Sequence, residues 1–174
     1  MVAKINTSGN LYGVLLCNLQ KVDKDSGTVL ATHIIREPTD GNFNAAGVAG
    51  EFTRWMPAQF RCEQPVLHIS INPDPKDNLD NNRMAEIAEQ YMDRMGWGGQ
   101  PYIVFKHTDI DRTHIHIVSV QVGSDGRKIK DSMRNKRSWK VVQALEKEYG
   151  LRPAQKAAAR ENWHLTPMTI RRAT

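Results

Sequence analysis

The chain of 174 residues has the length of a single domain with a sizeable core, and its contents of 40% apolar and 25% charged residues are those of an ordinary soluble globular protein. It contains no run of eighteen apolar residues, and its N-terminus lacks the apolar centre of a signal peptide, so we expect a cytoplasmic protein without a membrane segment. Two cysteines are too few for a disulfide framework, and a net charge of +5 favours polyanionic partners only weakly.

The N-terminal part of the chain predicts two strands and a helix. Residues 11–19 are mostly apolar and fit a buried strand, although periodicity does not exclude a helix that begins near Tyr12. Residues 28–36 are rich in β-branched side chains and predict a second strand, with the preceding Asp-Ser-Gly as a hairpin connection. Apolar residues then recur at three- and four-residue spacing over residues 45–56, which predicts an amphipathic helix that Pro57 ends or kinks.

A third strand and a second helix follow. Residues 65–72 alternate between an apolar face and a polar face, and the polar face carries His68 and Ser70. We expect that polar face to be able to line a site. Asp80 is a suitable N-cap for a helix that ends at Gly96, and the methionines on its apolar stripe are expected to fill the core.

Three of the six histidines lie in one predicted hairpin. Residues 102–105 and 115–122 are rich in β-branched and aromatic side chains, and a short polar loop separates them. His114 and His116 share one face of their strand because they are two residues apart, and a loop of this length can place His107 opposite His114. We therefore expect three imidazoles to converge on one patch.

Three neutral imidazoles make a good site for a divalent transition metal. Three protein ligands leave coordination positions free, which is typical of a catalytic rather than a structural metal site. Asp109 and Asp111 lie in the loop and can accept a hydrogen bond from the second nitrogen of a ligating ring, which would fix its tautomer.

A strongly basic segment comes directly after the hairpin and a Ser-Asp-Gly turn. It holds seven cations within fourteen residues against the single acid Asp131, which predicts a strip that contacts phosphates. The cations are Arg127, Lys128, Lys130, Arg134, Lys136, Arg137 and Lys140.

The C-terminal part predicts a last helix and a tail. Ser138 is a candidate N-cap for a helix that runs to Tyr149 and ends at Gly150. Residues 151–174 are rich in alanine and arginine and predict a linker or a partly ordered tail. The organisation that we expect is therefore one domain over residues 1–150, followed by this tail or by the start of a truncated helical extension.

The hairpin sequence HTDIDRTHIHIV, which begins at His107, resembles the third motif of conjugative relaxases, a branch of the HUH endonucleases. The blocks LYGVL, REPTDG, HISINPDPKD and SDGRKI resemble mobilisation relaxases of Bacteroides-type mobile elements. The resemblance covers residues 1 to about 155, most of the chain.

The resemblance implies an α+β fold with a five-stranded antiparallel sheet, the metal site on one face and helices packed on the other. It implies an enzyme that nicks one strand of single-stranded or hairpin DNA at an origin of transfer and so initiates mobilisation. A side-chain nucleophile, usually tyrosine, attacks the scissile phosphate, while a divalent metal polarises the phosphate oxygens. Accessory mobilisation and coupling proteins are further expected partners.

The implied site residues follow from the motif positions. His107, His114 and His116 would hold the metal, with manganese or magnesium as the expected ion, and Asp109 would orient a ligand. Lys21 and the basic segment would contact phosphates.

The first motif departs from the family pattern. The nucleophilic tyrosine is expected after the LYGVL block, in a context such as Leu-Ala-Tyr-Asn, but here Cys17 occupies that position. Cys17 is one candidate nucleophile, although a thiolate prefers softer centres than phosphorus. Tyr12 is a second candidate, and the third explanation, which we favour, is a form that binds metal and DNA but nicks poorly. A further interpretation makes Cys17 a small buried residue without chemical importance.

Two other functions compete with a relaxase. The first is a catalytically impaired module of the same fold that binds single-stranded or hairpin DNA. Cys17 favours it, and so does the length of the chain, because relaxases are expected to continue into further helices that clamp the single strand. The second is a small metal-dependent hydrolase without nucleic acid, which the basic segment disfavours.

Overall fold

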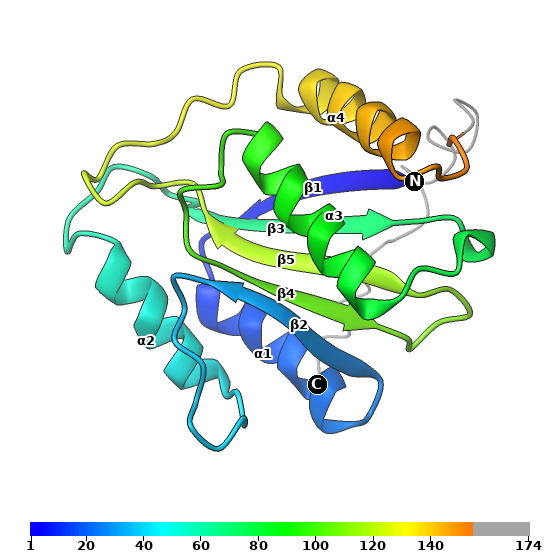
Figure 1. Cartoon of the computed structure of the whole chain (residues 1–174). Helices are drawn as coiled ribbons and strands as arrows, with labels where there is room; N and C mark the ends of the chain where they lie inside the picture. The colour runs from blue at the N-terminus through cyan, green and yellow to red at the C-terminus, as the bar shows by residue number, and fades with distance from the viewer. Residues whose placement is uncertain (155–174) are drawn as a thin grey trace, which may run out of the picture.

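A five-stranded antiparallel sheet in the order β1-β3-β5-β4-β2 forms the centre of the computed structural model, which describes residues 1–154 (Figure 1). The expected α+β class with a five-stranded antiparallel sheet is thus confirmed. Within the described residues, no helix is long and apolar enough to cross a membrane. The strands are β1 (Val2–Ser8), β2 (Gly27–His33), β3 (Val66–Asn72), β4 (Tyr102–His107) and β5 (His114–Val120), and the helices are α1 (Leu11–Asp23), α2 (Ala45–Trp55), α3 (Asn81–Arg94) and α4 (Arg134–Glu148), with a short 3₁₀ helix at Pro75–Asp77.

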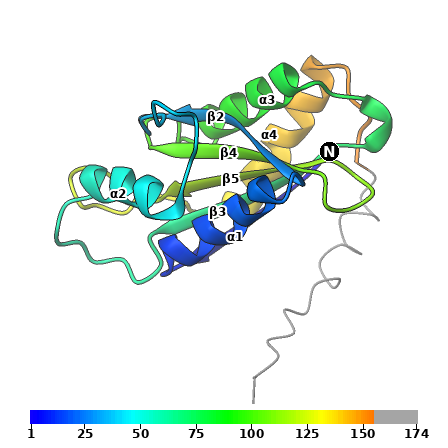
Figure 2. The ribbon, with the colours of Figure 1, turned by 90° about the horizontal axis from the view of Figure 1, so that it is seen from below.

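Helices cover both faces of the sheet, and Figure 2 shows the sheet between the pair α3 and α4 and the pair α1 and α2. The apolar face of β3 packs with α3 and α4, whereas α1 and α2 pack on the opposite face against Phe105 of β4 and Val118 of β5. The expectation that helices pack on one face only is therefore wrong. The reason is that β4 and β5 carry buried apolar residues on both faces, so helices must shield both faces from water.

The segment around residues 11–19 is a helix rather than the expected strand. The side chain of Asn10 caps α1 by accepting a hydrogen bond from the Gly13 backbone N–H at 2.8 Å, and Leu15 and Leu19 are buried one turn apart. An apolar run satisfies both helical and strand periods, and here the cap and the packing against α2 decide. The predicted hairpin with β2 is consequently absent, because β2 pairs with β4. The edge strand that pairs with β3 is β1, which was not predicted.

The two helices on the other face differ in how well the sequence predicted them. Asp80 caps α3 as expected, accepting from the Arg83 N–H at 2.8 Å, and Gly96 follows the helix with a φ of +80°. Ser138 is not the cap of α4, because α4 begins at Arg134. Ser138 instead lies buried inside α4, where its Oγ is 2.7 Å from the hydroxyl of Tyr91. Residues 155–174 of the predicted tail lie outside the described residues.

Candidate metal centre

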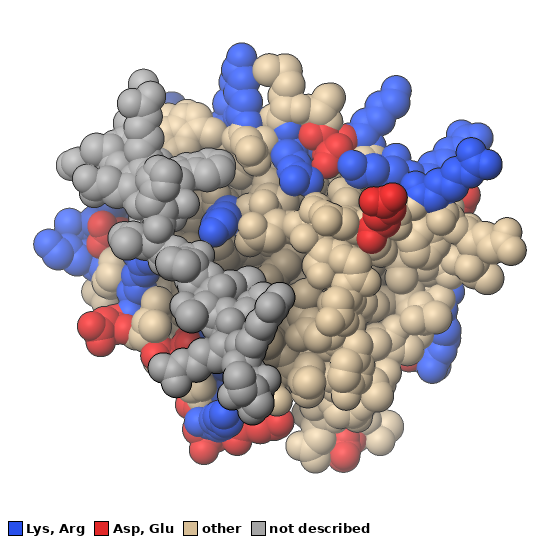
Figure 3. All heavy atoms as spheres, turned by 180° about the vertical axis from the view of Figure 1, so that it is seen from behind, with Lys and Arg blue, Asp and Glu red and all other residues tan. Residues whose placement is uncertain are grey.

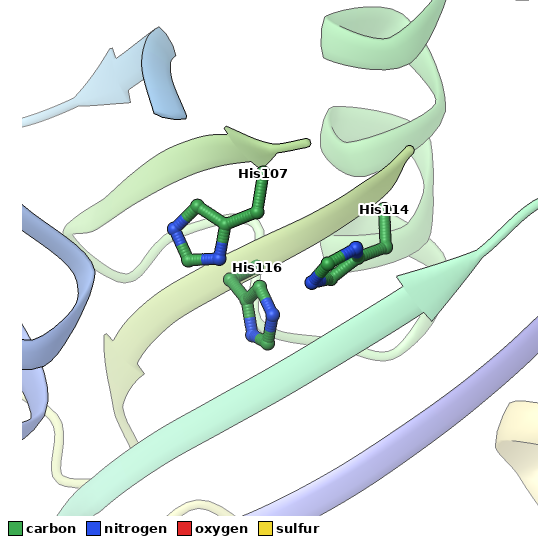
Figure 4. Close-up of side chains that lie close together, drawn as sticks. All are labelled: His107, His114 and His116. Atoms are coloured by element: carbon green, nitrogen blue, oxygen red, sulfur yellow. The ribbon is translucent and has the colours of Figure 1, made fainter. Parts of the chain in front are cut away.

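His107, His114 and His116 converge on one face of the sheet, on the side of α1 and α2. The register pairs His107 of β4 with His114 of β5, and His116 follows two residues along β5. One nitrogen of each ring lies within 4.8 Å of a nitrogen of the other two, and Figure 4 shows the three rings turned toward one another. The predicted convergence of the three side chains is confirmed, because paired residues of antiparallel strands project to the same face.

The three rings are held in the neutral form. Burial is the main cause: it lowers the pKa of His116 to about 2 and, together with the charge of Lys21, that of His107 to about 4. Burial also lowers the pKa of His114, although a hydrogen bond with Arg112 opposes the shift. Because a ring nitrogen must be unprotonated to bind a metal, this environment suits a ligand set.

Backbone and side-chain partners leave one nitrogen of each ring available. Nδ1 of His114 lies 3.2 Å from the carbonyl oxygen of Arg112, to which it can donate. Nε2 of His107 is buried without a hydrogen-bond partner among residues 1–154. A buried, unpaired ring nitrogen beside two other imidazoles costs free energy, and a divalent ion would satisfy it. The residues present therefore fit a metal.

His68 is a fourth histidine at the cluster, and the sequence indicated that it lies on a polar strand face able to line a site. Its Nε2 lies 2.9 Å from Nδ1 of His116. The alternation of β3 was the available signal, but the partner of that face depends on the register between β3 and β5.

Lys21 and Asp109 border the three histidines. Nζ of Lys21 lies 2.9 Å from Oδ2 of Asp109 and 3.5 Å from Nδ1 of His107. Oδ1 of Asp109 lies 3.8 Å from Nε2 of His114, so the carboxylate faces the nitrogen available for a metal. The second nitrogen of His114 is instead engaged by the Arg112 carbonyl, so the predicted way in which Asp109 orients a ring is wrong for His114. Asp111 is exposed.

Position 17 lies one helical turn before Lys21 on α1. Four residues correspond to about 40° around the helix axis and about 6 Å along it, so residues 17 and 21 share a side of α1. Tyr12 is nine residues before Lys21, which places it about 180° away. Cys17 is exposed, so the interpretation of a small buried residue is wrong.

The basic segment lies at the other end of β5 from the cluster. β5 has seven residues, which corresponds to about 20 Å at the usual rise. Lysine and arginine side chains project along the upper edge of the molecule in Figure 3, where Figure 1 places α4 and the segment before it. Asp131 pairs with Lys128 at 3.5 Å and with Arg134 at 3.1 Å, and Arg137 donates to the Met95 carbonyl oxygen at 2.8 Å.

A model of a protein family described as "Relaxase: MobA/VirD2-like, nuclease domain" matches residues 19–151 of the chain. The matched range contains all three clustered histidines and more than half of the chain. The chain belongs to this family of relaxase nuclease domains. The match confirms the expected mobilisation relaxase, but it begins after Cys17, and the finer likeness to Bacteroides-type elements remains a prediction.

Solved relaxase structures share the fold of this domain. A manganese-bound crystal structure of the MobM relaxase domain with oriT DNA of plasmid pMV158, at pH 4.6, is 12% identical and superimposes with a TM-score of 0.59, covering 92% of this chain and 98% of that chain. A second manganese-bound structure of MobM with the same DNA carrying a 3′ thiophosphate, at pH 6.8, is 14% identical, again with a TM-score of 0.59, and covers 94% of this chain and 98% of that chain. No match was found among curated proteins.

Proposed function

We propose that this relaxase nuclease domain nicks one DNA strand at an origin of transfer, with a divalent metal held by His107, His114 and His116. The convergence of three neutral imidazoles, one with a buried nitrogen that has no partner among residues 1–154, is the observation that carries the proposal. The MobM relaxase domain, which shares the fold, is bound to manganese and to origin DNA, and this supports manganese as the ion to test first.

The residues of this chain have separable roles in such a reaction. A divalent ion at the three histidines would supply Lewis-acid polarisation of the scissile phosphate oxygens. Lys21, whose ammonium lies beside the cluster, would contribute positive charge to the same phosphate. Asp109 holds Lys21 in place through their ion pair.

Position 17 is the proposed place of the nucleophile, and the cysteine there makes the chain a weak nickase. In the nicking step, the nucleophile loses its proton and forms a bond to phosphorus as the bond between phosphorus and the 3′ oxygen breaks, and that oxygen then takes up a proton. A thiol is a poor match for this hard centre, and Tyr12 lies on the side of α1 away from Lys21.

Two surfaces are proposed to contact DNA. The first is the polar part of the cluster's own sheet face, where exposed Lys4 and Asn6 of β1 pair in register with Ser70 and His68 of β3. The second is the basic segment, through its exposed cations Arg127, Lys130 and Lys136. Lys128 and Arg134 contribute to a smaller extent, because both form an ion pair with Asp131. Arg137 is not a free phosphate contact, because its guanidinium donates to the end of α3.

Manganese titration and strand nicking test the proposal. We expect the unaltered chain to bind manganese and His114→Ala to lose that binding while keeping its circular dichroism spectrum. His33→Ala is the matched control, because His33 lies on β2 opposite Tyr102, at the far end of β4 from His107. Unchanged manganese affinity in His114→Ala would exclude the assigned metal site.

A second function, DNA binding without nicking, is favoured by Cys17 at the nucleophile position. In that case the chain binds an origin oligonucleotide but forms no covalent adduct with it. Denaturing electrophoresis of the chain with a labelled oligonucleotide distinguishes the two functions, since a covalent adduct survives denaturation.

A further inference from the structure

The contact between His68 and His116 joins two strands that are distant in sequence. Nε2 of His68 and Nδ1 of His116 are 2.9 Å apart, the length of a well-formed hydrogen bond. The ring centroids are 4.9 Å apart and the ring planes are inclined by 30°, so the rings meet nearly edge to edge. One nitrogen of His116 is therefore committed to His68.

The sheet register produces this contact. β3 and β5 are neighbouring strands in the interior of the sheet, and they pair Ser70 with His116 and His68 with Val118. His68 and His116 are thus diagonal neighbours on one face, a separation that aromatic side chains bridge readily. Backbone pairing fixes both residues, so the hydrogen bond does not depend on a flexible segment.

Two neutral rings share one proton in this hydrogen bond, and the position of that proton decides what His116 can do. If Nδ1 of His116 is the donor, its Nε2 carries a lone pair and can bind a metal. If Nε2 of His68 is the donor, Nε2 of His116 carries the proton and cannot bind one. One tautomer of the pair therefore allows His116 to bind a metal, and the other prevents it.

We propose that His68 is a positioning residue for the metal centre, which accepts the Nδ1–H of His116 and thereby presents Nε2 of His116 to a divalent ion. The inference rests on the proposed function, because it presupposes a metal at the three histidines. Outer hydrogen-bond partners of ligating histidines usually contribute 10- to 100-fold to metal affinity, and this is the size of the effect expected from His68.

A purely structural role of His68 predicts different behaviour. His68 is partly buried among the strands, so any replacement of different shape would then affect the fold and, through it, all properties equally. The acceptor role instead separates two replacements of similar size. Gln can place an amide oxygen where Nε2 of His68 lies, whereas Leu has no acceptor there.

Manganese titration of the full chain and two variants provides the test. We expect His68→Leu to bind manganese 10- to 100-fold more weakly than the unaltered chain, and His68→Gln to bind within about threefold of it. Thermal unfolding of the metal-free proteins is the control for structure. Equal affinities in all three proteins, or an equal loss in both variants, would overturn the proposal.

Nitrogen NMR of the metal-free chain gives a second readout that is independent of metal binding. Long-range proton–nitrogen spectra distinguish the two tautomers of each neutral ring, and we expect His116 protonated at Nδ1 in the unaltered chain and in His68→Gln, but not fixed in that form in His68→Leu. Protonation of His116 at Nε2 in the unaltered chain would contradict the proposal. Failure of the unaltered chain to bind manganese would instead refute the proposed metal function, which separates the two outcomes.

Discussion

Nζ of Lys21 lies 2.9 Å from Oδ2 of Asp109, and this ion pair ties α1 to the loop between β4 and β5 at the border of the three clustered histidines. Partial burial raises the pKa of the Asp109 carboxyl, but the hydrogen bond and charge of Lys21 outweigh it, so that the pKa lies below its usual value. The pair thus places a fixed positive charge beside His107.

Replacing Lys21 should strengthen metal binding. The Lys21 ammonium beside His107 would repel a divalent ion at the three histidines by on the order of 1 kcal/mol even at the dielectric constant of water, and Lys21→Met also frees Asp109. We expect manganese affinity to rise roughly tenfold, measured by titration calorimetry. Lys24→Met, at an exposed lysine just after α1, is the matched control. Unchanged or weaker binding in Lys21→Met would contradict the assigned geometry.

The side chain at position 17 should limit nicking. Cys17→Tyr places a phenol one turn from Lys21, and we expect this variant to nick a labelled origin strand in manganese and to form a covalent adduct. The unaltered chain should do both weakly. Tyr12→Phe should match the unaltered chain, because Tyr12 lies on the other side of α1. Activity that disappears in Tyr12→Phe would make Tyr12 the nucleophile instead.

The metal-free fold should lose stability in mild acid. Burial keeps the pKa of His107 and His116 well below the value of about 6.5 that histidine has when unfolded. Below pH 6.5 the unfolded chain therefore binds more protons than the folded chain, so the free energy of unfolding falls as pH falls. Each such histidine contributes a slope of about 1.4 kcal/mol per pH unit between pH 6.5 and its folded pKa.

Urea unfolding with a chelator at pH 7.5, 6 and 5 measures this slope. His116→Asn, which removes one buried titrating ring, should reduce the slope by at most about 1.4 kcal/mol per pH unit. A free energy of unfolding that stays constant from pH 7.5 to 5 would show that these rings are not buried as described.

The basic segment should contribute affinity without sequence preference. Each phosphate contact adds about 0.7 to the log–log salt dependence of single-strand binding, and about 0.9 on duplex DNA. Replacing Lys130 and Lys136 by Gln should therefore reduce the slope by up to about 1.4 for single strands, measured by fluorescence anisotropy. The same double change should leave manganese affinity unaltered, since the segment lies at the other end of β5. An unchanged slope would place the DNA elsewhere on the surface.

The sequence by itself determined the histidine hairpin. Alternation along β5 and a short loop after β4 are local features, and together they place His107 opposite His114 with His116 on the same face. The same local reasoning found β3, α2 and the Asp80 cap of α3. It did not find β1, and it assigned α1 to a strand, because an apolar run alone does not distinguish the two periods.

Only the tertiary structure decided what surrounds the three histidines. Lys21 reaches His107 across 86 positions of sequence, and His68 reaches His116 across 48. These contacts depend on the packing of α1 on the sheet and on the register between β3 and β5, both of which are set by the burial of the whole core rather than by any local pattern. The three clustered histidines could therefore be predicted from sequence, whereas the residues in contact with them required the fold.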